Sequence, residues 1–374
     1  MANNNDNKVL NVPPLRFPEF TKEWEEHALA EYLDFKNGLN PDVKRIGRGL
    51  PFISVMDILA DGTINYDSIR GKVEATEREI ENFSVEKGDI LFQRSSETLE
   101  DVGRANVYMD NRTAVYGGFV IRGRKIGDYN PLFFKYLLST PLARKRTCRM
   151  GAGAQHFNIG QDGLSKISYC FPLMEEQNKI ARLLSLIDER IATQNKIIEK
   201  LQSLIKGLRV CCMQRNGSNN VYLSEIAQIY QPQTISSAEL TEDGFLVYGA
   251  NGIIGKYKDY NHKTEQICIT CRGNTCGMVN YTKPMSWITG NAMVINTDKY
   301  QDKVYKKYLY HYLSAYNFNS IISGSGQPQI VRTPLEKLKI TLPTISEQKQ
   351  KAMILDKVQD KIEINHNILN LYIL

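Results

Sequence analysis

The sequence contains one unit twice, and each copy ends in a segment with the apolar spacing of a long helix. A constant offset of 171 residues superimposes the stretch that begins at Pro172 on the stretch that begins at Pro343. Both stretches read Pro-x-x-x-Glu-Gln-x-x-x-Ala, and the match continues with Leu184 over Leu355. Two copies in one chain can form a pseudo-twofold object, which fits a target made of two separate parts.

The repeat extends upstream of the helices, with an offset that drifts as the loops differ in length. Strand-like apolar runs align in pairs, and Gly-x-Gly turns in both copies lead into clusters of Gln and Asn. The aligned pairs are residues 52–56 over 246–250, 89–95 over 267–273, 117–121 over 290–294 and the turns 151–153 over 324–326. Each unit is therefore predicted to be a mixed α/β globule that is followed by a helix.

The segment after Pro172 has the alternating spacing of four and three that is typical of a coiled-coil seam. A polar residue, Gln194, interrupts this seam, and Asn365 interrupts the second seam at the equivalent position. A buried amide has to find a partner, so these two residues are predicted to mark the register in which the helices pair. The alternative is an ordinary amphipathic helix packed on its own domain. The seam residues are Ile180, Leu184, Ile187, Ile191, Ile198, Leu201, Ile205 and Leu208.

The predicted fold class is α+β, with two mixed α/β domains separated by a pair of long antiparallel coiled-coil helices in a pseudo-twofold repeat. A length of 374 residues agrees with two domains. The predicted boundaries are a disordered N-terminus at 1–14, a first domain at 15–171, a first helix at 172–214, a linker at 215–221, a second domain at 222–342 and a shorter second helix at 343–374.

The bulk composition excludes few classes of partner. A net charge of +6 permits an anionic partner without demanding one. No apolar run is long enough to span a membrane and the N-terminus has no signal pattern, so a cytoplasmic location is expected. Seven cysteines in irregular positions indicate reduced thiols rather than a disulfide framework.

The opening of the sequence adds a family resemblance to the repeat. Residues 13–20 read Pro-Pro-Leu-Arg-Phe-Pro-Glu-Phe and are followed by Trp24. This start, together with the two Pro-x-x-x-Glu-Gln helices, resembles the specificity (S) subunits of type I restriction–modification enzymes. The resemblance covers nearly the whole chain, and its strength lies in an ordered set of motifs that occurs twice.

The resemblance implies a function and a set of partners. It implies two target-recognition domains, each of which reads one half of a bipartite DNA site, and helices that set the spacing between the halves. It implies docking of two methyltransferase (M) subunits, which use S-adenosylmethionine to methylate adenine, and of restriction (R) subunits, which use ATP and Mg²⁺. It implies no cofactor in this chain. The second helix, about ten residues shorter than the first, departs from the family's pattern.

DNA recognition requires cations for phosphates and amides or forked donors for base edges. Residues of these types lie just after predicted strands and Gly-x-Gly turns in both copies, although solvated loop side chains are the simpler explanation for any one of them. The predicted DNA-binding residues are Gln93, Arg94, Ser95, Arg104, Gln155 and Asn158 in the first copy, and Arg272, Asn274, Asn291, Gln327, Gln329 and Arg332 in the second.

Other sequence features do not support catalytic or metal chemistry. Cys268 and Cys271 lie in a strand-like run, where residues three apart face opposite sides, so zinc is not predicted. His311 lies in an aromatic, helix-like run and is predicted to be a packed core residue. There is no phosphate-binding Gly-x-x-x-x-Gly-Lys-Ser/Thr loop. The preferred interpretation is a non-catalytic DNA-recognition subunit; the alternatives are a self-contained methyltransferase or nuclease, and a coiled-coil scaffold without a DNA role.

Overall fold

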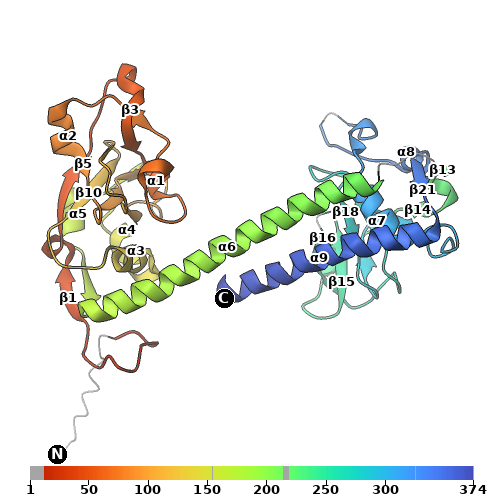
Figure 1. The fold of residues 1–374 in the computed structure, drawn as a ribbon. Helices are drawn as coiled ribbons and strands as arrows, with labels where there is room; N and C mark the ends of the chain where they lie inside the picture. Colours follow the sequence, from red (N-terminus) through yellow and green to blue (C-terminus); the bar gives the residue numbers. More distant parts are fainter. Residues whose placement is uncertain (1–11, 154, 214–218, 251, 325, 374) are drawn as a thin grey trace, which may run out of the picture. The chain divides into compact units, whose positions relative to one another are not determined.

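The computed structural model describes residues 12–153, 155–213, 219–250, 252–324 and 326–373. The chain divides after Arg190 into two compact units, 1–190 and 191–374. Helix α6 (Met174–Met213) begins in unit 1 and ends in unit 2 (Figure 1). Of the N-terminal segment predicted to be disordered, 1–14, residues 1–11 lie outside the described residues. The predicted linker at 215–221 is wrong at its end, because strand β13 begins at Asn219.

Unit 1 contains two four-stranded sheets. Its strands are β1 (Glu25–Ala28), β2 (Leu33–Asn37), β3 (Ile46–Ile53), β4 (Lys72–Val73), β5 (Ser84–Val85), β6 (Ile90–Gln93), β7 (Ser95–Ser96), β8 (Ala105–Val107), β9 (Ala114–Tyr116), β10 (Val120–Lys125), β11 (Phe157–Asn158) and β12 (Ser168–Phe171). The central sheet is antiparallel with the order β2-β10-β6-β8. The second sheet has the order β4-β3-β9-β5, and β3 runs parallel to β9. The helices that precede α6 are α1 (Val55–Ile58), α2 (Glu77–Phe83), α3 (Pro131–Ser139), α4 (Pro141–Cys148) and α5 (Gln161–Ser165).

Unit 2 repeats this topology with shorter connections. Its strands are β13 (Asn219–Tyr222), β14 (Gln228–Tyr230), β15 (Phe245–Gly249), β16 (Gly252–Tyr257), β17 (Ile267–Thr270), β18 (Val279–Tyr281), β19 (Trp287–Ile288), β20 (Ala292–Asn296) and β21 (Lys339–Leu342). The central order β14-β20-β17-β18 matches β2-β10-β6-β8 strand for strand, and β15 runs parallel to β19 as β3 does to β9. The helices are α7 (Lys306–Ala315), α8 (Arg332–Glu336) and α9 (Ile345–Ile373). The internal repeat predicted from the sequence is therefore present in the tertiary structure.

Strands β6 and β17 are buried on both faces, which explains why their first three residues are all apolar rather than alternating. In β6, Ile90 and Phe92 pack into the cluster that contains Phe134 of α3. Leu91 points to the opposite face and packs with Tyr116 of β9. The central sheet of unit 1 therefore lies between two apolar clusters, one under α3 and one under the second sheet.

Two buried cysteines follow the same two-faced arrangement in unit 2. Cys268 packs with Tyr248 and Ile288 in one cluster, whereas Cys271 packs into the cluster on the other side of the sheet. Burial raises the pKa of the Cys271 thiol. The prediction that these residues face opposite sides is confirmed. Within the described ranges, no group of three or more His, Cys, Asp and Glu side chains is placed to hold a metal ion.

The end of α6 and helix α9 pack side by side and antiparallel within unit 2 (Figure 1). Ile205 is 4 % exposed and lies in one cluster with the fully buried Leu355. The two predicted amides bind each other, because Gln194 Nε2 donates to Asn365 Oδ1 at 2.5 Å and to the Asn365 carbonyl at 3.0 Å. The partner that each amide needs is thus present, and their role in fixing register stays a prediction. No helix among the described residues combines the length and the apolarity that a membrane span requires.

A buried polar cluster joins three helices in unit 2. His311 of α7 has no exposed surface, and its Nε2 lies 3.0 Å from Asp356 Oδ1 of α9. Arg209 of α6 donates from Nε to His311 Nδ1 at 3.3 Å, which leaves the proton of the neutral ring on Nε2. The prediction that His311 is a packed histidine is confirmed. Burial and the nearby Arg209 and Lys307 cations lower the pKa of His311 below its usual value, against the opposing effect of Asp356.

This lowered pKa predicts that unit 2 loses stability in mild acid. A histidine whose pKa is lower in the folded chain takes up its proton more readily when unfolded, so its contribution is complete above the unfolded value of 6.5. That contribution is lost as the pH falls from 6.5 through the folded-state pKa, at up to about 1.4 kcal/mol per pH unit. Urea unfolding of wild type and His311→Gln between pH 7.5 and 5 should show a shallower slope for the variant. Equal slopes would contradict the prediction; His262, whose pKa burial also lowers, stays intact in both proteins.

Candidate nucleic-acid interface

Each unit contains one seven-residue loop that is closed in the same way. In unit 1, Ala152 and Asn158 exchange two backbone hydrogen bonds, both 2.9 Å long. In unit 2, Ser323 and Gln329 exchange two bonds of 2.9 and 2.8 Å. We call residues 152–158 loop L1 and residues 323–329 loop L2. Both loops contain the Gln/Asn clusters that the sequence singled out, but L1 holds only the second glycine of its Gly-x-Gly turn. The closures place Gly153 on Gly324, so the predicted alignment of the turns 151–153 and 324–326 is wrong by two residues.

A glycine in the same position makes each loop closure sterically feasible. Gly153 has φ +144° and Gly324 has φ +92°, a region that side-chain-bearing residues rarely adopt. A Cβ on Gly153 would lie 2.0 Å from the His156 carbonyl oxygen, and a Cβ on Gly324 would lie 2.4 Å from the Gln327 carbonyl oxygen. Both glycines are therefore required by the close approach of the loop's own backbone.

Both loops are attached to the end of the central strand. In unit 1, Asn158 pairs with Ser95, the second residue after β6. In unit 2, Gln329 pairs with Arg272, the second residue after β17. The rigid, doubly buried strand thus positions each loop, which is the arrangement that a recognition surface requires.

The backbone hydrogen bonds correct the alignment of the two copies by one residue. Arg94 donates its N–H to Phe119 O and accepts at its carbonyl from Ile159 N. The residue that makes the same two bonds in unit 2 is Cys271, which pairs with Asn291 O and Ile330 N. The counterpart of Arg94 is therefore Cys271, whereas Arg272 corresponds to Ser95. The expectation that the two arginines occupy matched places is wrong.

The side chains of Arg94 and Cys271 also lie against the equivalent backbone carbonyl in each unit. Arg94 Nη1 donates to the Gly118 carbonyl at 3.2 Å. In unit 2 the equivalent carbonyl, Gly290 O, accepts from Gln231 Nε2 at 3.0 Å and lies 3.6 Å from Cys271 Sγ. Arg94 is half-buried, so part of its guanidinium supports the turn before β10 and only part is open to a ligand.

Most of the remaining predicted residues are exposed at or near L1 and L2. Arg272, Asn274 and Gln327 come together around an open hollow of about 390 Å³ in unit 2. Ser95 is half-buried beneath L1. The exposed members of the predicted set at these loops are Gln155, Asn158, Arg272, Asn274, Asn291, Gln327 and Gln329.

Three predicted residues are less suited to a recognition surface. Gln93 is 4 % exposed and its Nε2 donates to the Ser95 carbonyl, so it supports the end of β6 instead of facing solvent. Arg104 and Arg332 are exposed, but each pairs with an acidic neighbour at 2.7 Å, Asp101 and Glu336 respectively. Exposed ion pairs of this kind are weak, so Arg104 and Arg332 can each exchange the acidic neighbour for another anion. Gln93 is buried and cannot reach a ligand.

Two arginines of the basic run in α4, Arg144 and Arg146, are engaged in the fold. Arg144 Nη2 donates to the Glu100 and Val102 carbonyls at 2.9 and 2.7 Å. Burial lowers the pKa of Arg144. Arg146 Nη1 donates to the Ser168 carbonyl at 2.5 Å. These two residues fix α4 to the adjacent segments, so part of each guanidinium group is already occupied by the fold.

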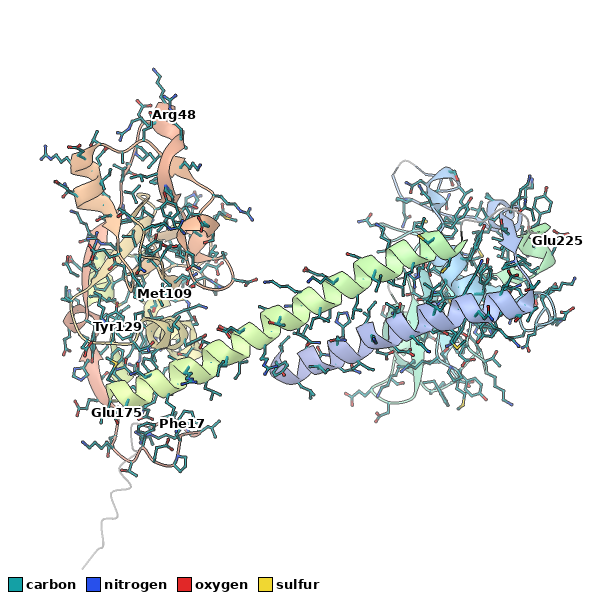
Figure 2. The ribbon with its side chains drawn as sticks, in the orientation of Figure 1. Phe17, Arg48, Met109, Tyr129, Glu175 and Glu225 are labelled. Carbon is teal, nitrogen blue, oxygen red and sulfur yellow. The ribbon has the colours of Figure 1, made fainter. Side chains whose placement is uncertain are left out.

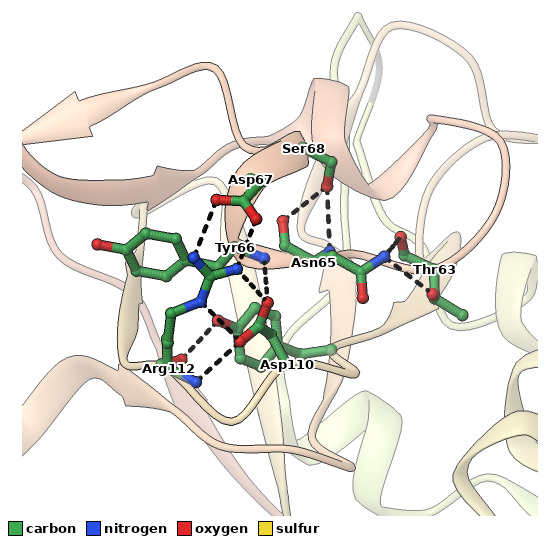
Figure 3. A network of polar contacts seen from close by, with 8 residues as sticks. Thr63, Asn65, Tyr66, Asp67, Ser68, Asp110 and Arg112 are labelled. Atoms are coloured by element: carbon green, nitrogen blue, oxygen red, sulfur yellow. Dashed lines mark hydrogen bonds and ion pairs between the residues drawn. The ribbon is translucent and has the colours of Figure 1, made fainter.

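Another arginine is held by acidic groups in unit 1 (Figure 3). Arg112 donates to both Asp67 oxygens at 2.9 and 2.7 Å and to both Asp110 oxygens at 3.1 and 2.8 Å. Its guanidinium also stacks over Tyr66, 4.2 Å from the ring centroid. Hydrogen bonds from Arg112 hold the pKa of Asp110 well below its usual range. This network ties the loop around Tyr66 to the segment after β8, and the five donors of Arg112 are largely satisfied.

The sequence interpretation missed an exposed basic turn at the start of β3. Arg48 is 73 % exposed at its side chain and pairs with Glu74 at 2.7 Å; Figure 2 shows it at the tip of unit 1. The neighbouring Gly47 and Gly49 have φ of +104° and +97°. The detectable signal was the Arg-Ile-Gly-Arg-Gly sequence at 45–49, where arginines alternate with turn-forming glycines.

The shared Glu-Gln motif has a structural function in both units. Gln177 Oε1 accepts from Asn130 N at 3.0 Å, and its Nε2 donates to Pro172 O at 3.0 Å. Gln348 repeats this with Tyr305 N at 2.7 Å and Pro343 O at 2.9 Å. Each glutamine is almost fully buried and joins the start of a long helix to the start of α3 or α7.

Replacing either glutamine by leucine should destabilise its unit. Gln348→Leu would keep the side-chain volume but leave backbone groups at Tyr305 and Pro343 buried without partners. We expect the free energy of unfolding to fall by about 1–3 kcal/mol, measured by urea denaturation. The exposed neighbour Lys349→Leu serves as the control and should change stability little. A Gln348→Leu protein as stable as wild type would show that these bonds do not hold α7 to α9.

Comparisons with known proteins agree with this architecture. The family model of the type I restriction modification DNA specificity domain matches residues 21–203 and again residues 216–371. A putative type I restriction enzyme MjaX specificity subunit of Methanocaldococcus jannaschii is 25 % identical and aligns over 96 % of this chain and 92 % of its own length. The EcoprrI specificity subunit of Escherichia coli is 32 % identical over 36 % of this chain and 34 % of its own.

Solved structures show the same fold. The type I restriction-modification S subunit from M. genitalium superimposes with a TM-score of 0.68 at 16 % identity, over 94 % of this chain and 93 % of that chain. A chain from a structural study of assembly of the type I R-M system superimposes with a TM-score of 0.54 at 14 % identity, over 93 % of this chain and 94 % of the other. With the family model matched twice, this chain belongs to the type I restriction modification DNA specificity family and carries two of its domains in tandem.

Proposed function

We propose that this chain recognises a bipartite DNA sequence for a type I restriction–modification complex, and that L1 and L2 each contact one half of the site. The observation that carries this is the identical closure of two loops that present different side chains. L1 exposes Gln155 and Asn158, whereas L2 exposes Gln327 and Gln329 beside Arg272. A shared scaffold with different amides and cations is suited to reading two different base sequences.

The proposed role is that of a reader without catalytic chemistry of its own. Its partners would be double-stranded DNA, two methyltransferase (M) subunits that carry S-adenosylmethionine, and restriction (R) subunits that use ATP and Mg²⁺. The paired helices would set the distance between the two half-sites. Purified chain incubated with DNA, Mg²⁺ and S-adenosylmethionine should neither methylate nor cleave; turnover by the chain alone would contradict this role.

The proposal that L1 and L2 contact DNA is tested by measuring which half of the site loses its sequence preference when each loop is altered. The chain is assembled with its methyltransferase subunits, and methylated adenines are mapped on a library of duplexes. Arg272→Ala should weaken binding by about 1–3 kcal/mol and relax the preference at one position in one half-site only. Asn158→Ala should relax a position in the other half-site. Lys299→Ala, a cation away from L2, is the control; unchanged preferences in both loop variants would move recognition elsewhere.

A further inference from the structure

The turn that leads into β10 is closed by the same backbone hydrogen bond as the turn that leads into β20. In unit 1, Val120 N donates to Gly117 O at 2.9 Å. In unit 2, Ala292 N donates to Thr289 O at 3.0 Å. The two turns therefore superimpose Gly117 on Thr289, one residue away from the alignment predicted for 117–121.

The second residue of both turns is a glycine that lies against a neighbouring loop. A Cβ on Gly118 would lie 1.8 Å from Asn40 Oδ1, and a Cβ on Gly290 would lie 2.4 Å from Thr234 Oγ1. Each glycine thus lets the turn approach its neighbour closely, which fixes the position of the residue that follows. That residue is Phe119 in unit 1 and Asn291 in unit 2.

Phe119 lies directly opposite Arg94 at the end of the strand pair β6–β10. Val120 pairs with Gln93, and Arg94 N donates to Phe119 O at 2.9 Å. Opposite residues of an antiparallel pair project to the same face, with Cβ atoms about 4.5–5.5 Å apart. The Arg94 carbonyl accepts from Ile159 N, which directly follows L1. Two inter-strand spacings place Phe119 roughly 10 Å from the base of L1.

The Phe119 ring is 68 % exposed, although it is apolar. A single exposed aromatic residue is common on protein surfaces. Phe119 differs because its backbone is fixed beside Arg94, whose guanidinium is only partly used by the fold. Its equivalent Asn291 is exposed as well and is one of the predicted DNA-binding residues. One position of the repeated scaffold therefore offers an amide in unit 2 and an apolar ring in unit 1.

We propose that Phe119 contacts the C5-methyl group of a thymine in the half-site that unit 1 reads. This methyl is the one alkyl group that unmodified base pairs present in the major groove, and a phenyl ring is a suitable partner for it. The open part of the Arg94 guanidinium lies on the same face and donates to a polar group near that thymine. Asn291 meets a polar base edge at the equivalent place in unit 2. The proposal rests on the proposed DNA-recognition function and adds the base that one residue selects.

The experiment removes the methyl group from the DNA and the ring from the protein. The chain is assembled with its methyltransferase subunits, and its target is identified from the adenines that it methylates. Each thymine of both half-sites is then replaced singly by deoxyuridine, and binding is measured by fluorescence anisotropy at fixed salt. One replacement should weaken binding of the wild-type complex about fourfold, the effect of exposing one buried methyl group. The same replacement should have no effect on the Phe119→Ala complex, because the two changes remove one contact.

Two further variants serve as controls. Phe119→Leu keeps an apolar side chain and should retain part of the discrimination between thymine and uracil. Ile126→Ala removes an equally exposed apolar side chain, 61 % exposed, that follows the last residue of β10. It lies roughly 20 Å along the strand from Phe119 and should leave binding to every duplex unchanged. Thermal unfolding should be the same for all four proteins, since neither altered side chain is buried.

The possible outcomes separate this inference from the proposed function. If no deoxyuridine duplex distinguishes wild type from Phe119→Ala, while Gly153→Ala still loses one half-site, the thymine contact is overturned and DNA recognition by L1 stands. If Phe119→Ala weakens thymine and deoxyuridine duplexes equally at every position, the ring acts as a wedge between base pairs and the methyl contact is also overturned. Sequence preferences that survive the changes in Phe119, L1 and L2 alike would contradict both proposals.

Discussion

Leu355→Ala should be among the most destabilising single truncations in unit 2. Leu355 has no exposed surface and packs with Ile205 and Ile362 in the cluster between α6 and α9. Removing three side-chain carbons, one methine and two methyls, from such a site leaves a cavity that rigid neighbouring helices cannot fill. We expect the free energy of unfolding to fall by about 2–5 kcal/mol. Urea denaturation followed by Trp287 fluorescence, in a Trp24→Phe background, reports on unit 2, because these are the only two tryptophans of the sequence.

The internal repeat supplies the matched control. Leu184→Ala makes the same chemical change at the equivalent position, where the side chain is half-exposed and the surface above it is open. The loss of stability should be clearly smaller than at Leu355. Equal losses at the two positions would show that α6 does not cover Leu355 in solution.

Gly324→Ala and Gly153→Ala should each disable recognition of one half-site. The new Cβ would overlap the Gln327 or His156 carbonyl oxygen, and the left-handed φ would be strained, so the loop has to open. In complexes with methyltransferase subunits, we expect affinity for the specific duplex to fall more than tenfold. Sequence preference should disappear in the half read by the altered unit and persist in the other half. Binding to single half-site duplexes, measured at fixed salt, separates the two effects.

Two nearby glycines control for the substitution itself. A Cβ on Gly326 of L2 or on Gly160 after L1 meets no atom within 4 Å. Gly326→Ala and Gly160→Ala should therefore retain specific binding close to wild type. If these control variants also lost specific binding, the effect of an added side chain would have a cause other than failure of the loop to close.

The sequence was sufficient to predict the repeat, the helices and their polar pair. Gln194 and Asn365 could be matched because a helix seam alternates apolar and polar residues with a period that fixes register. The shared Pro-x-x-x-Glu-Gln pattern was visible because Gln177 and Gln348 bind the same backbone groups in both units. A residue type is retained in both copies of a repeat when a specific hydrogen-bond geometry requires it.

The one-residue misalignment of Arg94 with Arg272 has a physical cause. β6 and β17 are buried on both faces, so their first three positions are all apolar and no alternation indicates which residue faces which side. Shifting such a strand by one residue changes nothing in its hydrophobic pattern, yet it exchanges the faces of all side chains. Only the hydrogen bonds of Arg94 and Cys271 to neighbouring strands reveal the true correspondence.

The amino-acid sequence by itself determined the duplicated α/β-plus-helix plan, because periodic burial and paired turn glycines are local, repeated signals. The tertiary structure decided which polar side chains are available to a ligand. Gln93, Arg144 and Arg112 have the chemistry of DNA-binding residues, but buried carbonyls and carboxylates already satisfy or enclose them. Whether a donor is free depends on partners distant in sequence, and only the folded chain brings those partners together.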